Sequence, residues 1–193
     1  MRVIAGRWRG RKLKSPPGAD IRPTTDRVKE AMFSMAGPAL DGALVLDLCC
    51  GAGSLGIEAL SRGAARVILV DTAARSLELA RSNLDLCGAE PTAFQLVRAA
   101  AETWLDRWTP GPERFFILAD PPYQSDAMGA IFARMVDLGA APGFNGGILE
   151  HGRDFRPDLA APSACRLDTR RYGASCLTVL RPPVAGHLGE GDI

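Results

Sequence analysis

Short apolar runs alternate with segments of helical periodicity through the middle of the chain. The runs are apolar on both faces, which is typical of strands in a parallel sheet that helices cover on both sides. We expect such strands at residues 43–50, 66–71, 92–99, 114–120 and 146–152. Helices are expected between them at residues 54–63, 73–88, 101–108 and 126–139. This order predicts an α/β fold with a mostly parallel sheet.

The two ends of the chain depart from this alternation. Residues 24–37 are expected to form a helix that Thr25 or Asp26 caps and that Gly37-Pro38 ends. Residues 164–182 hold two strand-like runs around Tyr172-Gly173, which predicts an antiparallel hairpin. With this hairpin the predicted sheet has seven strands.

The composition fits one globular domain. The chain has 193 residues, of which 47% are hydrophobic and 23% are charged. No apolar stretch has the length of a membrane span and no signal peptide is recognisable, so a cytoplasmic protein is expected. We expect a basic N-terminal segment at residues 1–24, the α/β domain at residues 25–184 and a flexible tail at residues 185–193.

The charges are distributed unevenly along the chain. Residues 1–30 contain nine Lys or Arg and three Asp or Glu, a local charge of +6. The rest of the chain has 14 basic and 19 acidic residues, a charge of −5. The basic N-terminal segment therefore favours an anionic partner, with a phosphate backbone as the first candidate.

The cysteines and histidines form no recognised site. The five cysteines, among them the adjacent Cys49 and Cys50, make no CxxC pair, and neither histidine lies in a motif. We therefore expect no metal site and no Cys/His catalysis. Cys49 and Cys50 are interpreted as small reduced hydrophobic residues after a strand.

A glycine-rich turn joins the first expected strand to the following helix. Gly51, Gly53 and Gly56 have the GxGxxG spacing, and Asp71 ends the next strand 20 residues after Gly51. Such glycines let the backbone approach a nucleotide, while the acidic residue binds a ribose hydroxyl. A turn with glycines for packing alone is the alternative. Asp47 before the turn and Asp71 after it favour the nucleotide.

NAD and S-adenosylmethionine both present an adenosine ribose to such a turn. Three features favour the methyl donor. Asp47 can face its cationic amino group, whereas a pyrophosphate would be repelled there. About forty residues precede the first strand, at which a dinucleotide domain usually begins. A terminal antiparallel hairpin also matches the methyltransferase arrangement.

The sequence Asp-Pro-Pro-Tyr at residues 120–123 follows the fourth expected strand. Its two prolines cannot continue a strand ladder, so they predict a stiff loop. Asp47, Asp71 and Asp120 all end expected strands, and ligands of open α/β sheets bind at that edge. The loop is therefore expected beside the cofactor.

A stiff loop of this composition could hold an exocyclic amine of a base. The Asp120 carboxylate and the Pro121 carbonyl could each accept an N–H and offset charge that builds up on nitrogen. Tyr123 offers a face on which an extruded base stacks. A tight turn with Asp and Pro chosen for turn geometry is the alternative.

Four stretches together resemble one bacterial family. "RWRGRKL", "RPTTDRVKEAMF", "DLCCGAGSLGIEALSRGA" and "DPPY" closely resemble the 16S ribosomal RNA (guanine-N2)-methyltransferases. The resemblance runs from about Val3 to Arg181, and "RPTTDRV" together with "DPPY" is its most specific part. It implies a Rossmann-like class I methyltransferase fold, S-adenosylmethionine as donor, and a guanine of the small ribosomal subunit as target.

The resemblance also implies roles for single residues. The target base is held by Asp120, Pro121 and Tyr123. The cofactor contacts are expected at Asp47, Cys49, Gly51, Gly53, Asp71, Thr72 and Ala101. The family tends to carry Asn or Asp for the adenine amine where this chain has Ala100, so the backbone N–H of Ala101 is expected to replace that contact.

The basic N-terminal segment is interpreted as an arm that binds RNA. Its cations would contact phosphates, and Trp8 would stack on an unpaired base or on the domain. The expected RNA-binding residues are Arg7, Trp8, Arg9, Arg11, Lys12, Arg22 and Thr25. Arg170, Arg171 and Tyr172 could extend the basic face, and a solvated basic terminus is the alternative.

Other functions compete with this reading. A DNA amino-methyltransferase could use the same loop, although 193 residues leave no room for a separate target-recognition domain. An NAD-dependent oxidoreductase would give the Asp-Pro-Pro-Tyr loop no role, and a non-catalytic RNA-binding module would keep a vestigial pocket. The preferred partner is 16S rRNA, within a small ribosomal subunit or its assembly intermediate.

Overall fold

The structure, a computed structural model, describes residues 1–16, 23–123, 125–157 and 165–183. Its strands are β1 (Leu44–Leu48), β2 (Arg66–Asp71), β3 (Phe94–Arg98), β4 (Phe115–Ala119), β5 (Phe144–Gly152), β6 (Arg166–Tyr172) and β7 (Ser175–Arg181). Its helices are α1 (Pro23–Ala36), α2 (Ser54–Ser61), α3 (Ala74–Cys87), α4 (Ala101–Arg107) and α5 (Ala127–Leu138). Short 3-10 helices lie at Gly37–Leu40 and Pro91–Ala93.

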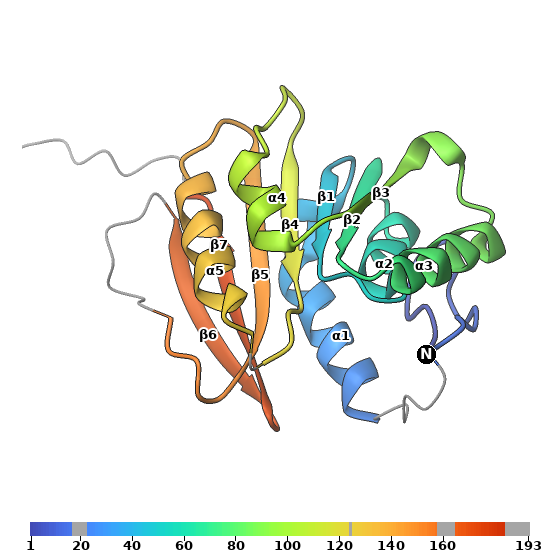
Figure 1. Cartoon of the computed structure of the whole chain (residues 1–193), viewed down its shortest axis with the longest axis horizontal. Helices are drawn as coiled ribbons and strands as arrows, with labels where there is room; N and C mark the ends of the chain where they lie inside the picture. Colours follow the sequence, from blue (N-terminus) through green and yellow to red (C-terminus); the bar gives the residue numbers. More distant parts are fainter. Residues whose placement is uncertain (17–22, 124, 158–164, 184–193) are drawn as a thin grey trace, which may run out of the picture.

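The seven strands form one sheet in the order β3-β2-β1-β4-β5-β7-β6. The first five strands in this order are parallel to one another, whereas β7 is antiparallel to both β5 and β6. Helices cover both faces of the sheet (Figure 1). The expected α/β fold with a terminal antiparallel hairpin is confirmed.

Two apolar layers hold the helices to the sheet. One layer lies between the sheet and α1, α2 and α3, and includes Met32, Leu60 and Leu84. The other lies between the sheet and α4 and α5, and includes Leu105 and Met135. Every residue of β1 and β4 is buried, so these strands are covered on both faces, as the sequence pattern indicated.

Helix α1 differs slightly from its predicted form. It begins at Pro23, before the expected cap, and it ends at Ala36, where a 3-10 turn continues the chain. Proline suits the first turn of a helix, because its missing N–H would have no partner there. The Thr25 side chain, Arg22 and the expected tail at residues 185–193 lie outside the described part of the chain.

The basic N-terminal segment folds back on itself. The Val3 N–H donates to the Arg11 carbonyl and the Leu13 N–H to the Met1 carbonyl, each at 3.0 Å. Val3, Trp8 and Leu13 are buried in the layer that also holds α1, α2 and α3. The segment is therefore hairpin-like, and it packs onto the α/β domain instead of projecting from it.

Candidate active site

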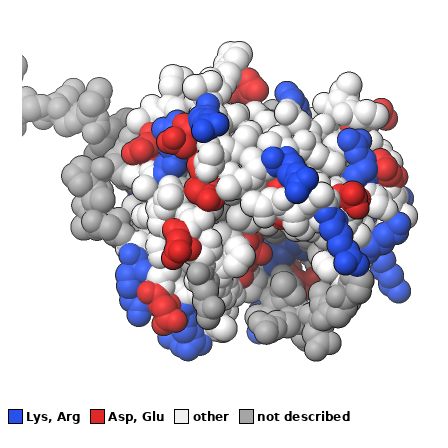
Figure 2. Space-filling view, in the orientation of Figure 1, with Lys and Arg blue, Asp and Glu red and all other residues white. Residues whose placement is uncertain are grey.

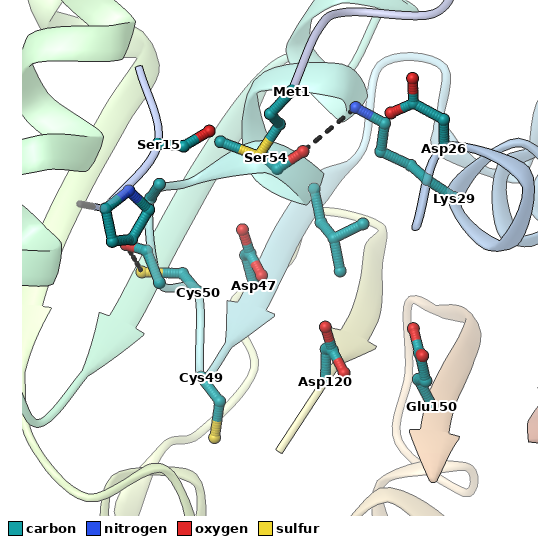
Figure 3. A pocket seen from close by; sticks show the side chains of 14 residues that line it. Met1, Ser15, Asp26, Lys29, Asp47, Cys49, Cys50, Ser54, Asp120 and Glu150 are labelled. Atoms are coloured by element: carbon teal, nitrogen blue, oxygen red, sulfur yellow. Dashed lines mark hydrogen bonds between the residues drawn. The ribbon is translucent and has the colours of Figure 1, made fainter. Parts of the chain in front are cut away.

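Three carboxylates from neighbouring strands line one pocket at the carboxyl edge of the sheet. Asp47 lies in β1, Asp120 follows β4 and Glu150 lies in β5. Asp47 pairs with Leu118 and Leu118 pairs with Ile148, so these three positions share a face. Side chains alternate along a strand, so Asp120 and Glu150, two residues further on, share that face as well. Figure 3 shows Asp120 between Asp47 and Glu150.

The N-terminal segment and α1 complete the wall of this pocket. The segment contributes Met1, Ser15 and Pro16, and α1 contributes Asp26 and Lys29 (Figure 3). These residues are far in sequence from the strand ends that they face. Periodicity could not place them at the site, because only tertiary packing brings them there.

Buried Glu58 of α2 fastens the N-terminal segment beside the pocket. Its oxygens accept the N–H groups of Ile4 and Ala5 at 2.7 and 2.9 Å. The same carboxylate forms ion pairs with Lys29 at 3.5 Å and Arg62 at 2.8 Å. Its charge and oxygens are thus satisfied by groups from the segment, α1 and the end of α2.

Asp47 is fully buried, and one of its oxygens lacks a protein partner. Oδ2 accepts the Gly56 N–H at 2.7 Å, whereas Oδ1 has no hydrogen bond within the described chain. A Cβ on Gly56 would lie 3.1 Å from Oδ2, so glycine permits this close approach of α2. Burial, opposed by the Gly56 bond and assisted by the Asp71 charge, raises the pKa of Asp47 to about 7. A cationic donor at Oδ1 would stabilise the ionised form.

The glycine-rich loop after β1 has the backbone that a ligand cradle requires. Gly51 and Gly53 have φ angles of 52° and 78°, which favour glycine. A Cβ on Gly53 would also lie 3.1 Å from the Cβ of Ala80 in α3. Cys49 has a φ of 61°, and burial followed by the Asp71 and Asp47 charges raises the pKa of its thiol to about 12. Cys49 lines the pocket as a protonated thiol, together with Gly51.

Asp71 orders the loop from the end of β2. Its Oδ2 accepts the Gly51 N–H at 2.9 Å and its Oδ1 accepts the Ala73 N–H at 2.8 Å. Each carboxylate oxygen retains a further lone pair for a hydroxyl donor. Asp71, the exposed Thr72 and the buried Ala101 at the start of α4 lie outside the lining of this pocket, along the edge of β2 and β3.

The Asp-Pro-Pro-Tyr loop leaves β4 as a tight, hydrogen-bonded connection. The Asp120 N–H donates to the Leu48 carbonyl at 3.3 Å, which extends the pairing of β4 with β1 by one residue. Pro121 is buried, and the Pro122 carbonyl accepts the Ser125 N–H at 2.9 Å. These hydrogen bonds order the loop and hold Asp120 at the end of the sheet.

The pocket disfavours the charged form of Asp120. Asp120 is exposed to solvent at one side, but protein atoms surround it on the others, and Glu150 and Asp47 add negative charge. Loss of water, followed by these two charges, raises the pKa of Asp120 well above its ordinary value. A positive charge or hydrogen-bond donors in the pocket would reverse this effect.

Tyr123 is held at both its hydroxyl and its ring. The hydroxyl lies 2.8 Å from Glu150 Oε1, to which it donates, and 2.6 Å from Ser175 Oγ. A Cβ on Gly152 would lie 3.1 Å from the ring, so the absence of a side chain there lets the ring approach β5. The residue is 44% exposed, which leaves ring surface for a planar ligand.

Glu150, Gly152 and Ser175 were absent from the sequence-based site. The available signal was Glu150 itself, an acidic residue within the largely apolar run at residues 146–152. Ser175 offered no such signal. It reaches Tyr123 because β7 pairs antiparallel with β5, which places Ser175 opposite Gly152.

The cations of the N-terminal segment have different environments. The Arg7 guanidinium lies 4.2 Å from the centre of the Trp8 ring, and Trp8 is only 9% exposed. Of its two expected positions, Trp8 therefore takes the one against the domain, because its ring is buried. Arg11 donates to the Leu86 carbonyl near the end of α3. The solvent-exposed cations that were expected to bind RNA are Arg7, Arg9, Arg11 and Lys12.

Exposed cations occur over much of the surface, and some of them lie on the N-terminal segment and near the β6–β7 turn. Figure 2 shows Lys and Arg side chains on the side of the molecule that carries α3 and the N-terminal segment. Arg170 and Arg171 are exposed near the β6–β7 turn, where Arg170 pairs with Asp168 at 3.0 Å. That turn lies at the carboxyl edge of β5, and Arg153 donates to the Gly173 carbonyl within it. Basic side chains thus occur on two sides of the pocket.

Among the residues that the structure describes, none of the helices combines the length and apolarity of a membrane span. The same residues contain no group of three or more His, Cys, Asp or Glu side chains placed to hold a metal ion.

Comparisons with known proteins place the chain among methyltransferases. The family model described as "Conserved hypothetical protein 95" matches residues 1–180. "Putative rRNA methyltransferase YlbH" of Bacillus subtilis is 43% identical over 132 residues, which cover 68% of this chain and 71% of that protein. "Ribosomal RNA small subunit methyltransferase D" of Escherichia coli K12 is 49% identical over 71 residues, which cover only 37% of this chain and 36% of that protein.

Solved structures agree with this placement. "Putative methyltransferase yhhF from Escherichia coli" superposes with a TM-score of 0.75 at 26% identity, over 94% of this chain and 97% of that one. A hypothetical protein of Thermus thermophilus gives a TM-score of 0.73 at 26% identity, over 94% and 99%. The expected class I methyltransferase fold is confirmed. Because the family model spans nearly the whole sequence, the chain belongs to the conserved hypothetical protein 95 family.

Proposed function

We propose that this protein transfers a methyl group from S-adenosylmethionine to the exocyclic N2 amine of a guanine in 16S rRNA. The observation that carries this proposal is the buried, unpartnered Asp47 Oδ1 in the same pocket as Asp120. The Asp47 carboxylate suits the cationic amine of the cofactor, and the Asp120 carboxylate suits the neutral amine of a base. The names of the relatives support the class of substrate.

The residues around the glycine loop fit S-adenosylmethionine. Its ammonium group would satisfy Asp47 Oδ1, and its positive charge would favour the ionised carboxylate. Gly51 and Gly53 would carry the backbone against the ligand, and Asp71 would accept a ribose hydroxyl. When bound, the cofactor supplies an electrophilic methyl group on a sulfonium ion. A dinucleotide pyrophosphate would meet repulsion at Asp47, so NAD chemistry has no support here.

The Asp-Pro-Pro-Tyr loop would hold the target base. The lone pair of N2 is delocalised into the guanine ring, so the amine needs help to react. Asp120 and the Pro121 carbonyl would accept the amine N–H groups, and Asp120 would take the proton that the nitrogen loses as its bond to the methyl carbon forms. Tyr123 would support the face of the base. Held by two hydrogen bonds, its ring forms a fixed surface.

The RNA chain would follow the basic surface of the N-terminal segment. Arg7, Arg9 and Lys12 are exposed there and would contact phosphates. Thr25 and Arg22 were also expected to bind RNA, and they stay predictions. A base of 16S rRNA implies a cytoplasmic site of action, on the small subunit or its assembly intermediate.

The decisive experiment uses small ribosomal subunits from a bacterial strain that lacks this protein. Purified protein and S-adenosylmethionine should add N2-methylguanosine to these subunits, as nucleoside mass spectrometry of the 16S rRNA would show. Subunits from the parent strain, already modified, should accept little further methyl. Methylation of another base, or of DNA in preference to rRNA, would contradict the proposal.

A further inference from the structure

Glu150 of β5 lines the same pocket as Asp120 and has no role in the function proposed above. We infer that Glu150 selects guanine, because its Oε2 would accept the guanine N1–H while its Oε1 holds Tyr123. Glu150 would then be a specificity-determining residue that touches the base. This inference rests on the proposed function, because it needs a guanine in the pocket.

The register of the sheet brings Glu150 beside Asp120. Ala119 of β4 pairs with Leu149 of β5, and the next residue in each chain is Asp120 or Glu150. Their side chains share one face of the sheet and line the same pocket. Figure 3 shows both carboxylates reaching into the pocket side by side. A ligand that reaches Asp120 therefore passes next to Glu150.

The two oxygens of Glu150 have separate uses. Oε1 accepts the Tyr123 hydroxyl at 2.8 Å. Oε2 has no hydrogen-bond donor among the residues that the structure describes. The Tyr123 ring lies against Gly152 and its hydroxyl bonds to Glu150. A base stacked on this ring would therefore lie next to Glu150, whose neighbour across the sheet is Asp120.

Two adjacent carboxylates match the Watson–Crick edge of guanine. Guanine presents N1–H and the N2 amine as neighbouring donors, whereas adenine and cytosine present a ring-nitrogen acceptor beside the amine. With guanine, Glu150 and Asp120 would each receive a donor. With adenine or cytosine, the ring nitrogen would face the Glu150 charge without a hydrogen bond, which is costly in a confined site. Glu150 would thus separate guanine from other bases that carry an exocyclic amine.

Binding at N1–H would also assist the transfer. A negative charge beside N1–H increases the electron density of the conjugated N2 lone pair. The same negative charge stabilises the positive charge that develops on the base as the N2–carbon bond forms. Loss of the Glu150 charge should therefore lower kcat and not only raise the KM for RNA.

The test replaces the target guanine by 2-aminopurine in reconstituted small subunits. This base keeps the exocyclic amine but has an acceptor at N1 in place of N1–H. The wild-type protein should favour guanine by about 10–100-fold in kcat/KM, as expected for one hydrogen bond to a charged group. In Glu150→Gln this preference should fall at least about tenfold, because a side-chain amide can donate to N1 or accept from N1–H.

Two matched variants separate base recognition from support of Tyr123. Tyr123→Phe and Ser175→Ala each remove one hydroxyl at the Tyr123 anchor and leave the Glu150 charge in place. Both should raise the KM for RNA and keep the guanine preference. Equal loss of preference in Tyr123→Phe and Glu150→Gln would show that Glu150 only anchors the ring, and would overturn the inference.

Folding and the proposed function are controlled separately. Calorimetric binding of S-adenosylmethionine reports whether Glu150→Gln is folded. If it is not, Glu150→Asp, which keeps the charge but withdraws it by one methylene, should show the reduced preference. Unchanged preference in a folded variant would refute the role of Glu150. A wild-type protein that methylates no guanine would instead refute the proposed function.

Discussion

Asp47 should make the affinity for S-adenosylmethionine depend on pH. In the free protein its pKa lies at about 7, mainly because the side chain is fully buried. Only the ionised carboxylate can pair with an ammonium group, so the ligand lowers this pKa and binding releases a proton. The ionised fraction rises from about one tenth at pH 6 to about three quarters at pH 7.5. The affinity should therefore rise roughly eightfold across this interval.

Isothermal titration calorimetry tests this expectation in buffers of different ionisation enthalpy. The wild-type protein should release about 0.8 proton per ligand near pH 6.5, and less as the pH rises. Asp47→Asn keeps an oxygen for the Gly56 N–H, should bind more weakly, and should lose this pH dependence. The amine of the ligand titrates identically in both experiments. The ratio of the wild-type affinity to the Asp47→Asn affinity therefore reports the titration of Asp47 alone. A ratio that is the same at pH 6 and pH 7.5 would refute the reasoning.

Three further substitutions test the remaining parts of the site. Asp120→Asn should lower kcat by roughly 10²–10³ in single-turnover assays and leave S-adenosylmethionine affinity within about threefold, because the carboxylate acts on the base. Asp71→Ala should weaken S-adenosylmethionine binding by about 1.5–3 kcal/mol in calorimetry, because a ribose hydroxyl loses a charged acceptor, and unchanged affinity would remove Asp71 from the site. Replacing Arg7 and Arg9 by Ala should make the slope of log binding constant against log salt concentration less steep, by about 0.7–0.9 per lost phosphate contact. Arg11→Ala should also lower the melting temperature, because Arg11 donates a hydrogen bond to α3.

The sheet and the position of the site at its edge were predictable, because the local sequence patterns match the strands and the loop found in the fold. Apolar runs predicted β1 and β4, and the spacing of Gly51, Gly53 and Gly56 predicted the loop between β1 and α2, where Gly51 and Gly53 have positive φ. The carboxyl ends of parallel strands meet at one edge, so Asp47 and Asp120 were expected to meet there. They line one pocket in the structure.

Residues whose position depends on long-range packing escaped prediction. Ser175 contacts Tyr123 because β7 pairs with β5, and the sequence alone did not define that register. Trp8 lies among basic residues, as an aromatic RNA contact often does, but its apolar ring is buried in the core. An aromatic residue among cations serves either purpose, and only packing decides between them. Glu58 likewise showed no local sign that it would bind the N-terminal segment.

The common face of Asp47, Asp120 and Glu150 has a consequence for engineering. Because side chains alternate along a strand, deleting one residue from β4 would turn Asp120 toward α4 and α5 while most of the strand still paired. Such a variant would keep the shape of the fold and lose its reactive group. Insertions or deletions within β1, β4 or β5 therefore keep the carboxylates in the pocket only if they add or remove an even number of residues. Any chimera of this domain must join these strands with their residue parity preserved.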